Sequence, residues 1–477
     1  MSPIQLLRGT ARWLLAATIA LGAATSHAAI VGLAGNLAGN VRSFELFAAD
    51  GYISAADGVQ IYMWGYGAPI TAGGTGLMQI SGPTLLVRQG ETVNISFTNN
   101  LLTRSSIMFP GQSGLTASGG NAGVLAQEAG PGQTVTYSFT ASQAGTYLYQ
   151  SGTQPGLQVE MGLVGALIVY PTGTGVPAST AATKWAYGHA GTAYERETLF
   201  VVSDADSDIH VAIDEQMKAM RAASAPCLTI TPTAPTGCVF TADLSHRFPK
   251  YWFLNGRTSP DVFAKNNIGE LPHQPYNTLP RLHPGERILL RMVGAGADLH
   301  PMHHHGNNSW AIARDGRMLS SDPATRGPNL ALSDYTIKVV PGQTYDAVWT
   351  WTGAGIGWDI YGKLCDPAVV NPAAPNFCTH TPQQRHQLAS DIGKPIPVRL
   401  PSELELAYGE FYSGSPYLDD FGMRPVGAGL ANTTGAIFHM FHSHNEREVV
   451  NGGVFPGGMM TMLVVEPFGV PIDPSQP

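Results

Sequence analysis

Apolar and polar residues alternate over many short stretches of this chain. Residues 92–97, Thr-Val-Asn-Ile-Ser-Phe, are one such stretch, and a turn containing Gly90 precedes it. Alternation with a period of two is typical of a β-strand with one buried face. Only 13% of the residues are charged, while Gly (56) and Pro (35) are abundant, as in proteins built from short strands joined by turns. The pattern predicts an all-β protein.

Four features of the sequence occur twice in the same order, which indicates an internal duplication. Each copy has a Gly-containing turn before an alternating strand, then a short motif, a Pro-Gly-Gln-Thr turn and a closing apolar strand. Two β-sandwich domains in tandem account for all four features. The matching pairs are 87–97 with 282–291, 107–111 with 300–306, 131–139 with 341–351, and 164–171 with 460–467.

The duplication predicts where the domains lie. We place the first sandwich at residues 29–172, a linker or partial domain at 173–250, and the second sandwich at 251–470 with an insertion at 355–434. Within the linker, residues 209–222 carry apolar side chains at helical spacing and predict a helix. The insertion is either a functional cover or a solvent-facing loop, because long loops at the ends of sandwiches serve both purposes.

The N-terminus has the features of a secretory signal peptide at residues 1–28. Arg8 and Arg12 precede an apolar run, and small residues end at Ala28, after which we expect cleavage. A retained N-terminal anchor is the alternative. Cleavage implies an exported protein, periplasmic or extracellular, in which disulfides persist. The four cysteines form two local pairs that we expect to be bonded, Cys227 with Cys238 and Cys365 with Cys378.

The charge balance narrows the classes of partner. The chain has 26 basic and 34 acidic side chains, and without Arg8 and Arg12 the mature chain would have 24 against 34, a formal charge of −10. An acidic protein is poorly suited to binding nucleic acid. The sequence after residue 28 has no apolar run long enough to cross a bilayer, so we predict no membrane span after cleavage.

Paired histidines mark the second copy of the repeat. His303 and His305 are two residues apart, and so are His442 and His444. Side chains at this spacing on a β-strand point to the same face, so two such strands side by side would bring four imidazoles to one metal ion. The second copy therefore predicts a metal site. The first copy has no histidine at the matching places, which hold Met108, Pro110, Gln150 and Gly152.

These motifs resemble those of the multicopper oxidase family. The run His-Pro-Met-His-His-His-Gly at 300–306 is similar to a signature of the family's last domain, and the likeness covers most of residues 80–470. The resemblance implies tandem cupredoxin-like Greek-key sandwiches in a secreted enzyme that oxidises its substrate at one copper and reduces dioxygen at a three-copper cluster. Because the two-domain members commonly form trimers, it also implies a homotrimer.

Carried over by position, the resemblance assigns copper ligands in the second domain. His300 falls at a type 1 ligand position, and Met459 lies near the axial position of that copper. Met108 replaces a first-domain histidine and would face the metal. The ligands implied for the three-copper cluster are His303 as type 2, and His305, His442 and His444 as type 3.

The chain also departs from the family pattern. The histidines of the first domain are missing, so half of the three-copper cluster is absent and a homotrimer could not restore it. Ser443 stands where the family has the type 1 cysteine, and a hydroxyl does not replace the soft thiolate bond to copper. Glu448 replaces another ligand and is a metal ligand, a hydrogen-bond partner of a ligand, or a charge partner of Arg447. A laccase-type cycle is therefore not expected.

The sequence as a whole predicts an exported copper-binding oxidoreductase with a reduced, histidine-bound copper centre. Its substrate would be a small molecule or a metal ion, and the sequence identifies no catalytic residue beyond the ligands. A copper-handling protein without turnover and a metal-free interaction module are the alternatives. Zinc would accept the same nitrogen ligands, whereas iron or manganese would require carboxylates. We expect His303, His305, His442 and His444 as ligands, with His300, Glu448, Met459 and Met108 in a second tier.

Four other residues in these motifs favour a structural role. His304 and His439 are out of phase with the paired histidines, so strand alternation points them to the other face. Met460 and Met462 lie in the closing strand and are expected to fill the core.

Overall fold

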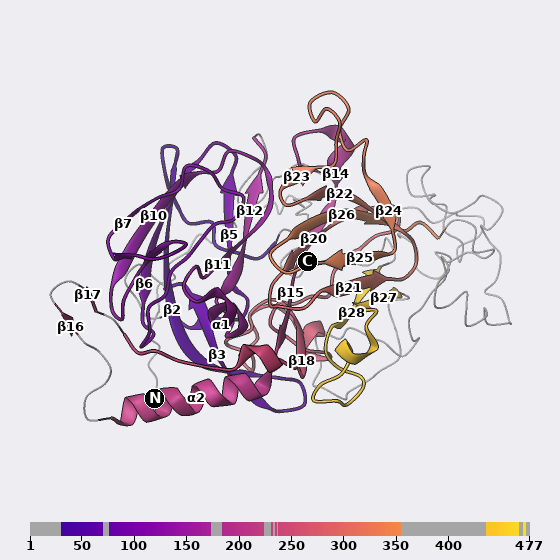
Figure 1. The fold of residues 1–477 in the computed structure, drawn as a ribbon. Coiled ribbons are helices and arrows are strands. Elements are labelled where there is room, and N and C mark those ends of the chain that lie inside the picture. The colour runs from indigo at the N-terminus through magenta and orange to yellow at the C-terminus, as the bar shows by residue number, and fades with distance from the viewer. Residues whose placement is uncertain are drawn as a thin grey trace, which may run out of the picture.

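The structure is a computed structural model, and it describes residues 30–69, 76–172, 184–223, 230–231, 234–235, 237–353, 436–466 and 471–473. Within these ranges the chain forms two β-sandwiches that lie side by side, with two α-helices (Figure 1). The all-β prediction is confirmed. None of the helices in these ranges is both long and apolar enough to cross a membrane.

Several sequence predictions lie outside the described residues. These are the signal peptide at 1–28, the insertion at 355–434, and the cysteines at 227, 365 and 378. Cys238 is disulfide-bonded, but its pairing with Cys227 stays a prediction because only Cys238 is described.

The first sandwich consists of a large and a small sheet. The alternation at residues 92–97 is realised in β6, where every second side chain is buried. The small sheet has the order β11 (Gly145–Gln150), β12 (Val164–Tyr170), β5 (Gly82–Arg88). The large sheet has the order β4 (Met78–Gln79), β3 (Gln60–Gly67), β2 (Val41–Ser54), β6 (Thr92–Asn99), β10 (Thr134–Thr140), β7 (Thr116–Ser118), with β1 (Asn36–Ala38) paired to β2.

Aromatic rings fill the space between these two sheets. Tyr66 of β3 meets Phe97 of β6 edge to face with ring centroids 5.9 Å apart, and it meets Tyr149 of β11 at 5.4 Å. All three rings are fully buried. Such pairs stabilise a core beyond the area they bury. A hairpin of β8 (Asn121–Ala122) and β9 (Gln127–Glu128) and the short helix α1 (Pro155–Glu160) flank this sandwich.

The second sandwich repeats the arrangement with a larger second sheet. Its first sheet has the order β18 (Tyr251–Leu254), β15 (Arg196–Ala205), β20 (Arg287–Gly294), β26 (Thr344–Thr350), β22 (Ser309–Arg314), β23 (Arg317–Met318), with β24 (Leu332–Asp334) paired to β22. The facing sheet has the order β19 (Arg281–Leu282), β28 (Met460–Val465), β27 (Ile437–Ser443), β21 (His300–His304), β25 (Thr336–Val339).

The second sandwich begins earlier in the chain than the predicted residue 251. Strand β15 pairs in parallel with β20 over seven residue pairs, so it lies inside the sheet of the second sandwich. Phe200 of β15 stacks on Phe441 of the facing sheet, with ring centroids 4.6 Å apart. The linker therefore contributes a central strand, because its apolar residues complete this core.

The predicted helix at 209–222 is confirmed as α2 (Ser207–Ala222). The Asp206 side chain accepts a hydrogen bond from the backbone nitrogen of Asp208, which satisfies one of the unpaired donors at the helix start. Ile213 and Met217 are buried against the first sandwich, along which α2 runs (Figure 1). The remaining short strands are β13 (Lys184–Trp185), β14 (Ala193–Tyr194), β16 (Ile230–Thr231) and β17 (Ala234–Pro235). Short 3₁₀-helices, labelled η, are η1 (Ala190–Thr192), η2 (Leu244–His246), η3 (Asp261–Phe263) and η6 (Glu446–Glu448).

A buried polar cluster joins the two sandwiches. Arg291 of β20 is fully buried and pairs with Glu197 of β15 at 2.9 Å and with Asp346 of β26 at 3.7 Å. Thr146 of β11, in the first sandwich, donates a hydrogen bond to Asp346 at 2.6 Å and accepts one from Arg291 at 3.0 Å. Burial raises the pKa of Asp346, and the Arg291 guanidinium opposes that rise. Arg291 is therefore the positive charge that contacts both carboxylates of the cluster.

Removing that charge should destabilise the fold. Arg291→Met should lower the free energy of unfolding by about 3–5 kcal/mol, because two buried carboxyl groups would lose the guanidinium that pairs with both of them. Chemical denaturation followed by tryptophan fluorescence measures the change. Arg314→Met, at an exposed arginine, is the matched control and should change stability by less than about 0.5 kcal/mol. Equal effects of the two substitutions would contradict this role for Arg291.

Candidate metal site

Two neighbouring strands of the second sandwich carry the paired histidines. Strands β21 and β27 are antiparallel, and their register places His303 directly opposite His442. The ladder continues past the strand ends, since the His305 backbone nitrogen donates to the Met440 carbonyl at 2.9 Å and that of His444 to the Pro301 carbonyl at 2.8 Å. The four imidazoles therefore lie on one face, as the spacing predicts.

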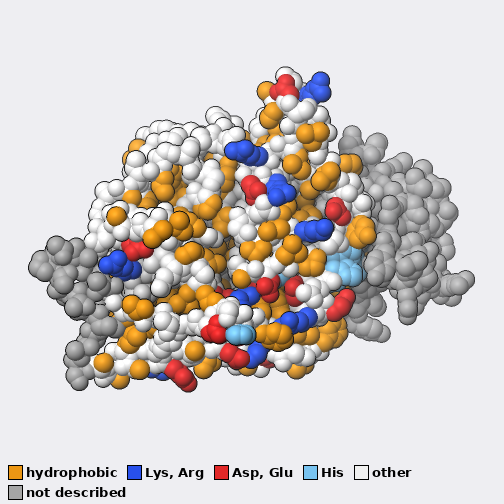
Figure 2. All heavy atoms as spheres, viewed as in Figure 1, with side chains coloured by type: hydrophobic (Ala, Val, Ile, Leu, Met, Phe, Trp, Pro, Cys, Tyr) orange, Lys and Arg blue, Asp and Glu red, His pale blue; other side chains and the backbone are white. Residues whose placement is uncertain are grey.

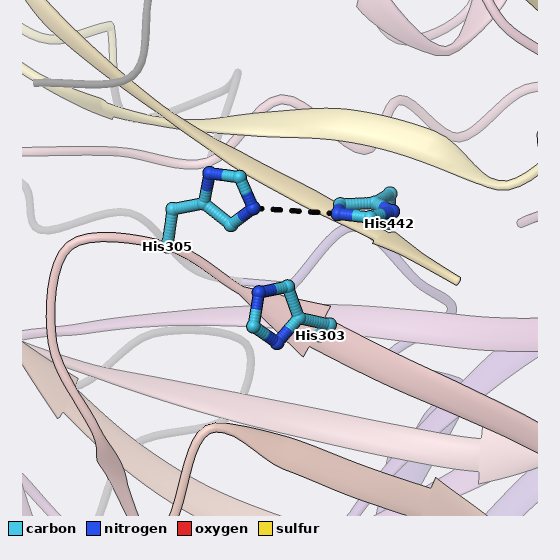
Figure 3. Close-up of side chains that lie close together, drawn as sticks. All are labelled: His303, His305 and His442. Carbon is cyan, nitrogen blue, oxygen red and sulfur yellow. Dashed lines mark hydrogen bonds between the residues drawn. The ribbon is translucent and has the colours of Figure 1, made fainter. Parts of the chain in front are cut away.

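Three of these imidazoles form a compact group. One ligand atom from each of His303, His305 and His442 lies within 4.8 Å of the others. The Nε2 atoms of His305 and His442 are 3.4 Å apart and point toward each other (Figure 3). His444 lies beside this group, with its ring centroid 4.8 Å from that of His303 and 5.7 Å from that of His442. We call these four residues the histidine cluster.

The histidine cluster lies at the edge of the second sandwich. His303 is only 2% exposed, whereas the His444 side chain is 39% exposed. Figure 2 shows histidine side chains reaching the surface over the ends of β21 and β27. The site is therefore closed toward the core and open on the side of His444.

Burial and mutual proximity keep the imidazoles neutral. Burial, together with the neighbouring rings of His442 and His444, lowers the pKa of His303 to about 4. The same causes lower the pKa of His305 to about 3, and burial lowers that of His442. Neutral imidazoles keep a nitrogen lone pair, which a metal ligand requires.

Hydrogen bonds fix how two of these rings are turned. Nδ1 of His303 lies 3.0 Å from Oγ1 of Thr336, and Nδ1 of His442 lies 2.7 Å from the carbonyl oxygen of Ser443. Partners of this kind hold metal-bound histidines in one orientation and one tautomer. Thr336 was not anticipated from the sequence, because it lies on β25 and only the pairing of β25 with β21 brings it to His303.

The spacing of the nitrogens suits a single metal ion. Two nitrogen ligands about 2.0 Å from one ion, subtending about 116° at it, would lie 3.4 Å apart, which is the separation of the two Nε2 atoms. The residues present therefore fit a small cation that prefers imidazole.

His300 and Glu448 do not join the histidine cluster. They lie on the inner face of the sheet, where Nδ1 of His300 is 2.9 Å from Oε2 of Glu448 and Nε2 is 3.3 Å from Oδ2 of Asp204. The Ser443 hydroxyl donates to the same Glu448 oxygen at 2.5 Å. The positions that resemble a type 1 copper site are thus occupied by a hydrogen-bonded ionic network. Asp204 comes from β15, and no signal in the sequence pointed to it.

His300 is the positively charged residue between the two carboxylates of this network. Burial alone would lower the pKa of His300, but hydrogen bonds to Asp204 and Glu448 outweigh it and raise the pKa to about 9. Arg247 closes the network on the other side, with Nη2 2.5 Å from Oδ1 of Asp204. His300 is therefore an imidazolium between two carboxylates.

The two methionines of the second tier lie elsewhere. Met459 is fully buried in the core of the second sandwich, and its carbonyl accepts a hydrogen bond from the Ser443 backbone at 3.0 Å. Met108 pairs with Gln150 inside the first sandwich. That pair is the counterpart of His303 and His442 in the other copy, so the duplicated register is retained without the ligands.

His304 and His439 point into the second sandwich, as strand alternation requires. His439 packs between Trp349 and Trp351, with ring centroids 5.5 and 5.0 Å away. Gly306, at φ +91°, lies against this ring, and a Cβ there would come 2.4 Å from Nδ1 of His439. Burial lowers the pKa of both His304 and His439 to about 3. Of the two methionines expected to fill the core, Met462 is buried in the core of the second sandwich, whereas Met460 is partly exposed.

A tandem β-sandwich with a histidine cluster in its second copy is thus the class that the fold and site define. A family profile described as multicopper oxidase matches residues 77–174, in the first sandwich. That stretch is similar to a multicopper oxidase domain, the family that the sequence motifs of the second sandwich also resemble.

Curated relatives match short stretches of the chain. A copper-containing nitrite reductase of Neisseria meningitidis is 31% identical over 116 residues, which is 24% of this chain and 27% of the relative. An L-ascorbate oxidase of Brassica rapa subsp. pekinensis is 36% identical over 94 residues, or 19% of this chain and 16% of the relative. The chain therefore aligns with about a quarter or less of either relative.

Solved structures align over longer stretches at lower identity. The alignment with a blue copper oxidase from Nitrosomonas europaea spans 89% of this chain and 85% of the oxidase, with 17% sequence identity and a TM-score of 0.48. The alignment with a copper nitrite reductase from the same organism spans 65% of this chain and 85% of the reductase, with 16% sequence identity and a TM-score of 0.40.

The His300 network predicts a loss of stability at alkaline pH. The folded-state pKa of about 9 lies above the ordinary value of 6.5, so the stabilisation is complete below about pH 6.5 and is lost as the pH rises through about 9. Denaturation midpoints measured from pH 6 to 10 test this. His300→Gln should flatten the dependence, whereas His246→Gln, at an exposed histidine, should leave it intact. A dependence that survives His300→Gln would assign it to another group.

Proposed function

We propose that this chain is a copper-binding oxidoreductase of multicopper-oxidase type whose redox chemistry takes place at one histidine-bound centre. His303, His305 and His442 would hold the ion, and His444 would complete the centre at its open side. The observation that carries the proposal is the convergence of three neutral imidazoles, with ligand atoms within 4.8 Å, from two strands in fixed register.

Copper is the ion that the donor set and the relatives favour together. Imidazole suits copper and zinc alike, but affinity for nitrogen sites among divalent first-row ions is highest for copper. The matched relatives bear the names of copper enzymes. Carboxylates would favour iron or manganese, and two of those nearby, Asp204 and Glu448, are engaged with His300 on the other face of the sheet. Glu446 lies 3.8 Å from Nδ1 of His444 at the exposed edge of the cluster.

The residues around the centre have separate tasks. Thr336 and the Ser443 carbonyl would orient the rings of His303 and His442. The closed inner side would exclude water from most of the ion, while the exposed edge of His444 would admit a small molecule or a metal ion as substrate. Bound copper would supply a one-electron change of oxidation state. Export, the two disulfides and a homotrimer remain part of this proposal.

Copper binding without turnover is the second candidate function. The network of His300, Glu448 and Ser443 favours it, because it occupies the place from which a thiolate-bound copper would pass electrons onward. A chain that holds copper for delivery needs the histidine cluster but no such electron path.

Loss of a ligand should abolish tight copper binding. His303→Ala and His442→Ala should each weaken Cu(II) binding by more than about 100-fold, because removing a group that merely orients a ligand already costs about 10–100-fold. Calorimetric titration of purified protein measures the affinity, and circular dichroism checks that the variants fold. His246→Ala, at an exposed histidine, is the control and should bind as the wild type does. Unchanged affinity in both cluster variants would refute the site.

Oxygen uptake separates the two candidates. Wild-type protein loaded with copper and freed of excess ion should consume dioxygen continuously when ascorbate is supplied as electron donor, because the centre would return to its oxidised state after each turnover. His303→Ala should consume none above the rate of buffer. A wild type that binds copper tightly yet shows no sustained uptake would favour the copper-binding candidate and contradict the oxidoreductase.

A further inference from the structure

Tyr335 is an exposed aromatic residue in contact with the buried part of the histidine cluster. It lies between β24 and β25, where the chain passes from one sheet of the second sandwich to the other. Its side chain is 55% exposed. Its ring meets that of His303 almost at a right angle, 88°, with centroids 5.5 Å apart. A single side chain thus connects solvent to a ring that is itself 2% exposed.

The position of Tyr335 is fixed by its neighbours. Its carbonyl oxygen accepts a hydrogen bond from the backbone of His304 at 3.2 Å, and the next residue, Thr336, contacts Nδ1 of His303 at 3.0 Å. Both contacts tie this short segment to β21. The backbone of Tyr335 is therefore held where its ring contacts that of His303.

A second exposed aromatic residue lies on the adjoining strand. Trp310 is 54% exposed and pairs in the ladder with Ser333, two residues before Tyr335. Exposed apolar surface often marks a place where another molecule rests. The Tyr335 ring, exposed on one side and against His303 on the other, offers such a place without contact to the ion.

We propose that Tyr335 is the residue through which electrons from an external donor enter the copper centre. The inference rests on the proposed function. The donor would rest against Tyr335, lose one electron and be released oxidised by one unit, and the copper that the histidine cluster would hold would accept that electron. The electron would pass through the Tyr335 ring to the His303 ring, and neither side chain is changed at the end of the step.

This route takes the place of the missing thiolate. Ser443 lies on the inner face, engaged with Glu448, and its hydroxyl has no soft orbital overlap with copper. The competitors among the described residues are the cluster histidines that reach solvent themselves, which could pass an electron directly. These are His444, whose side chain is 39% exposed, and the half-buried His305 and His442. The two routes differ in the residue that they need, so substitution distinguishes them.

The reduction rate tests the route. Copper-loaded wild type, Tyr335→Phe and Tyr335→Leu are mixed without oxygen with hexaammineruthenium(II), a donor that does not coordinate copper, and loss of the Cu(II) electron paramagnetic resonance signal is followed. Tyr335→Phe keeps the ring and should react as fast as the wild type. Tyr335→Leu should be slower by about an order of magnitude. Trp185→Leu, at a 45% exposed tryptophan elsewhere, should leave the rate unchanged.

A second readout does not depend on turnover. With tyrosine rings labelled with carbon-13, Cu(II) should broaden the Tyr335 resonance, assigned through Tyr335→Phe, at the first equivalent added. Copper bound without this broadening would place the ion elsewhere and overturn the proposed function itself. Broadening together with an unchanged reduction rate in Tyr335→Leu would leave the site standing and overturn the electron route in favour of direct entry through an exposed cluster histidine.

Discussion

The register between β21 and β27 is the constraint on which the site depends. With His303 opposite His442, the period of two along both strands brings every second imidazole to the outer face. A slip of one residue would turn the ligands into the core and expose Met302 and Phe441, which are buried. The apolar inner face therefore fixes the register, and the register fixes the cluster.

The two faces of this strand pair carry opposite kinds of chemistry. On the outer face, crowded imidazoles are neutral and can share a cation. On the inner face, an imidazolium lies between Asp204 and Glu448, and the Ser443 hydroxyl completes the network. Because the ionic network satisfies its own charges, it needs no metal, and it links β27 to β15 of the facing sheet.

Much of the fold followed from local pattern, whereas long-range pairing did not. Alternation and the internal repeat predict two sandwiches, and helical spacing predicts α2. The place of β15 in the second sheet was missed, because its parallel pairing with β20 joins segments about ninety residues apart and leaves no local signal.

The candidate site shows the same division. The paired spacing of histidines identifies the cluster, but Thr336 reaches His303, and Asp204 reaches His300, only through tertiary structure. The separation of His300 from the cluster could have been read from the sequence, since it lies three positions before His303 and an odd interval reverses the face of a strand.

X-ray absorption at the copper edge of the loaded protein shows which atoms bind the ion. A centre held by the histidine cluster should give imidazole nitrogen scatterers at about 2.0 Å from copper and no sulfur scatterer near about 2.3 Å. A sulfur shell, or a first shell of oxygen alone without imidazole, would contradict the assignment of the centre to the histidine cluster.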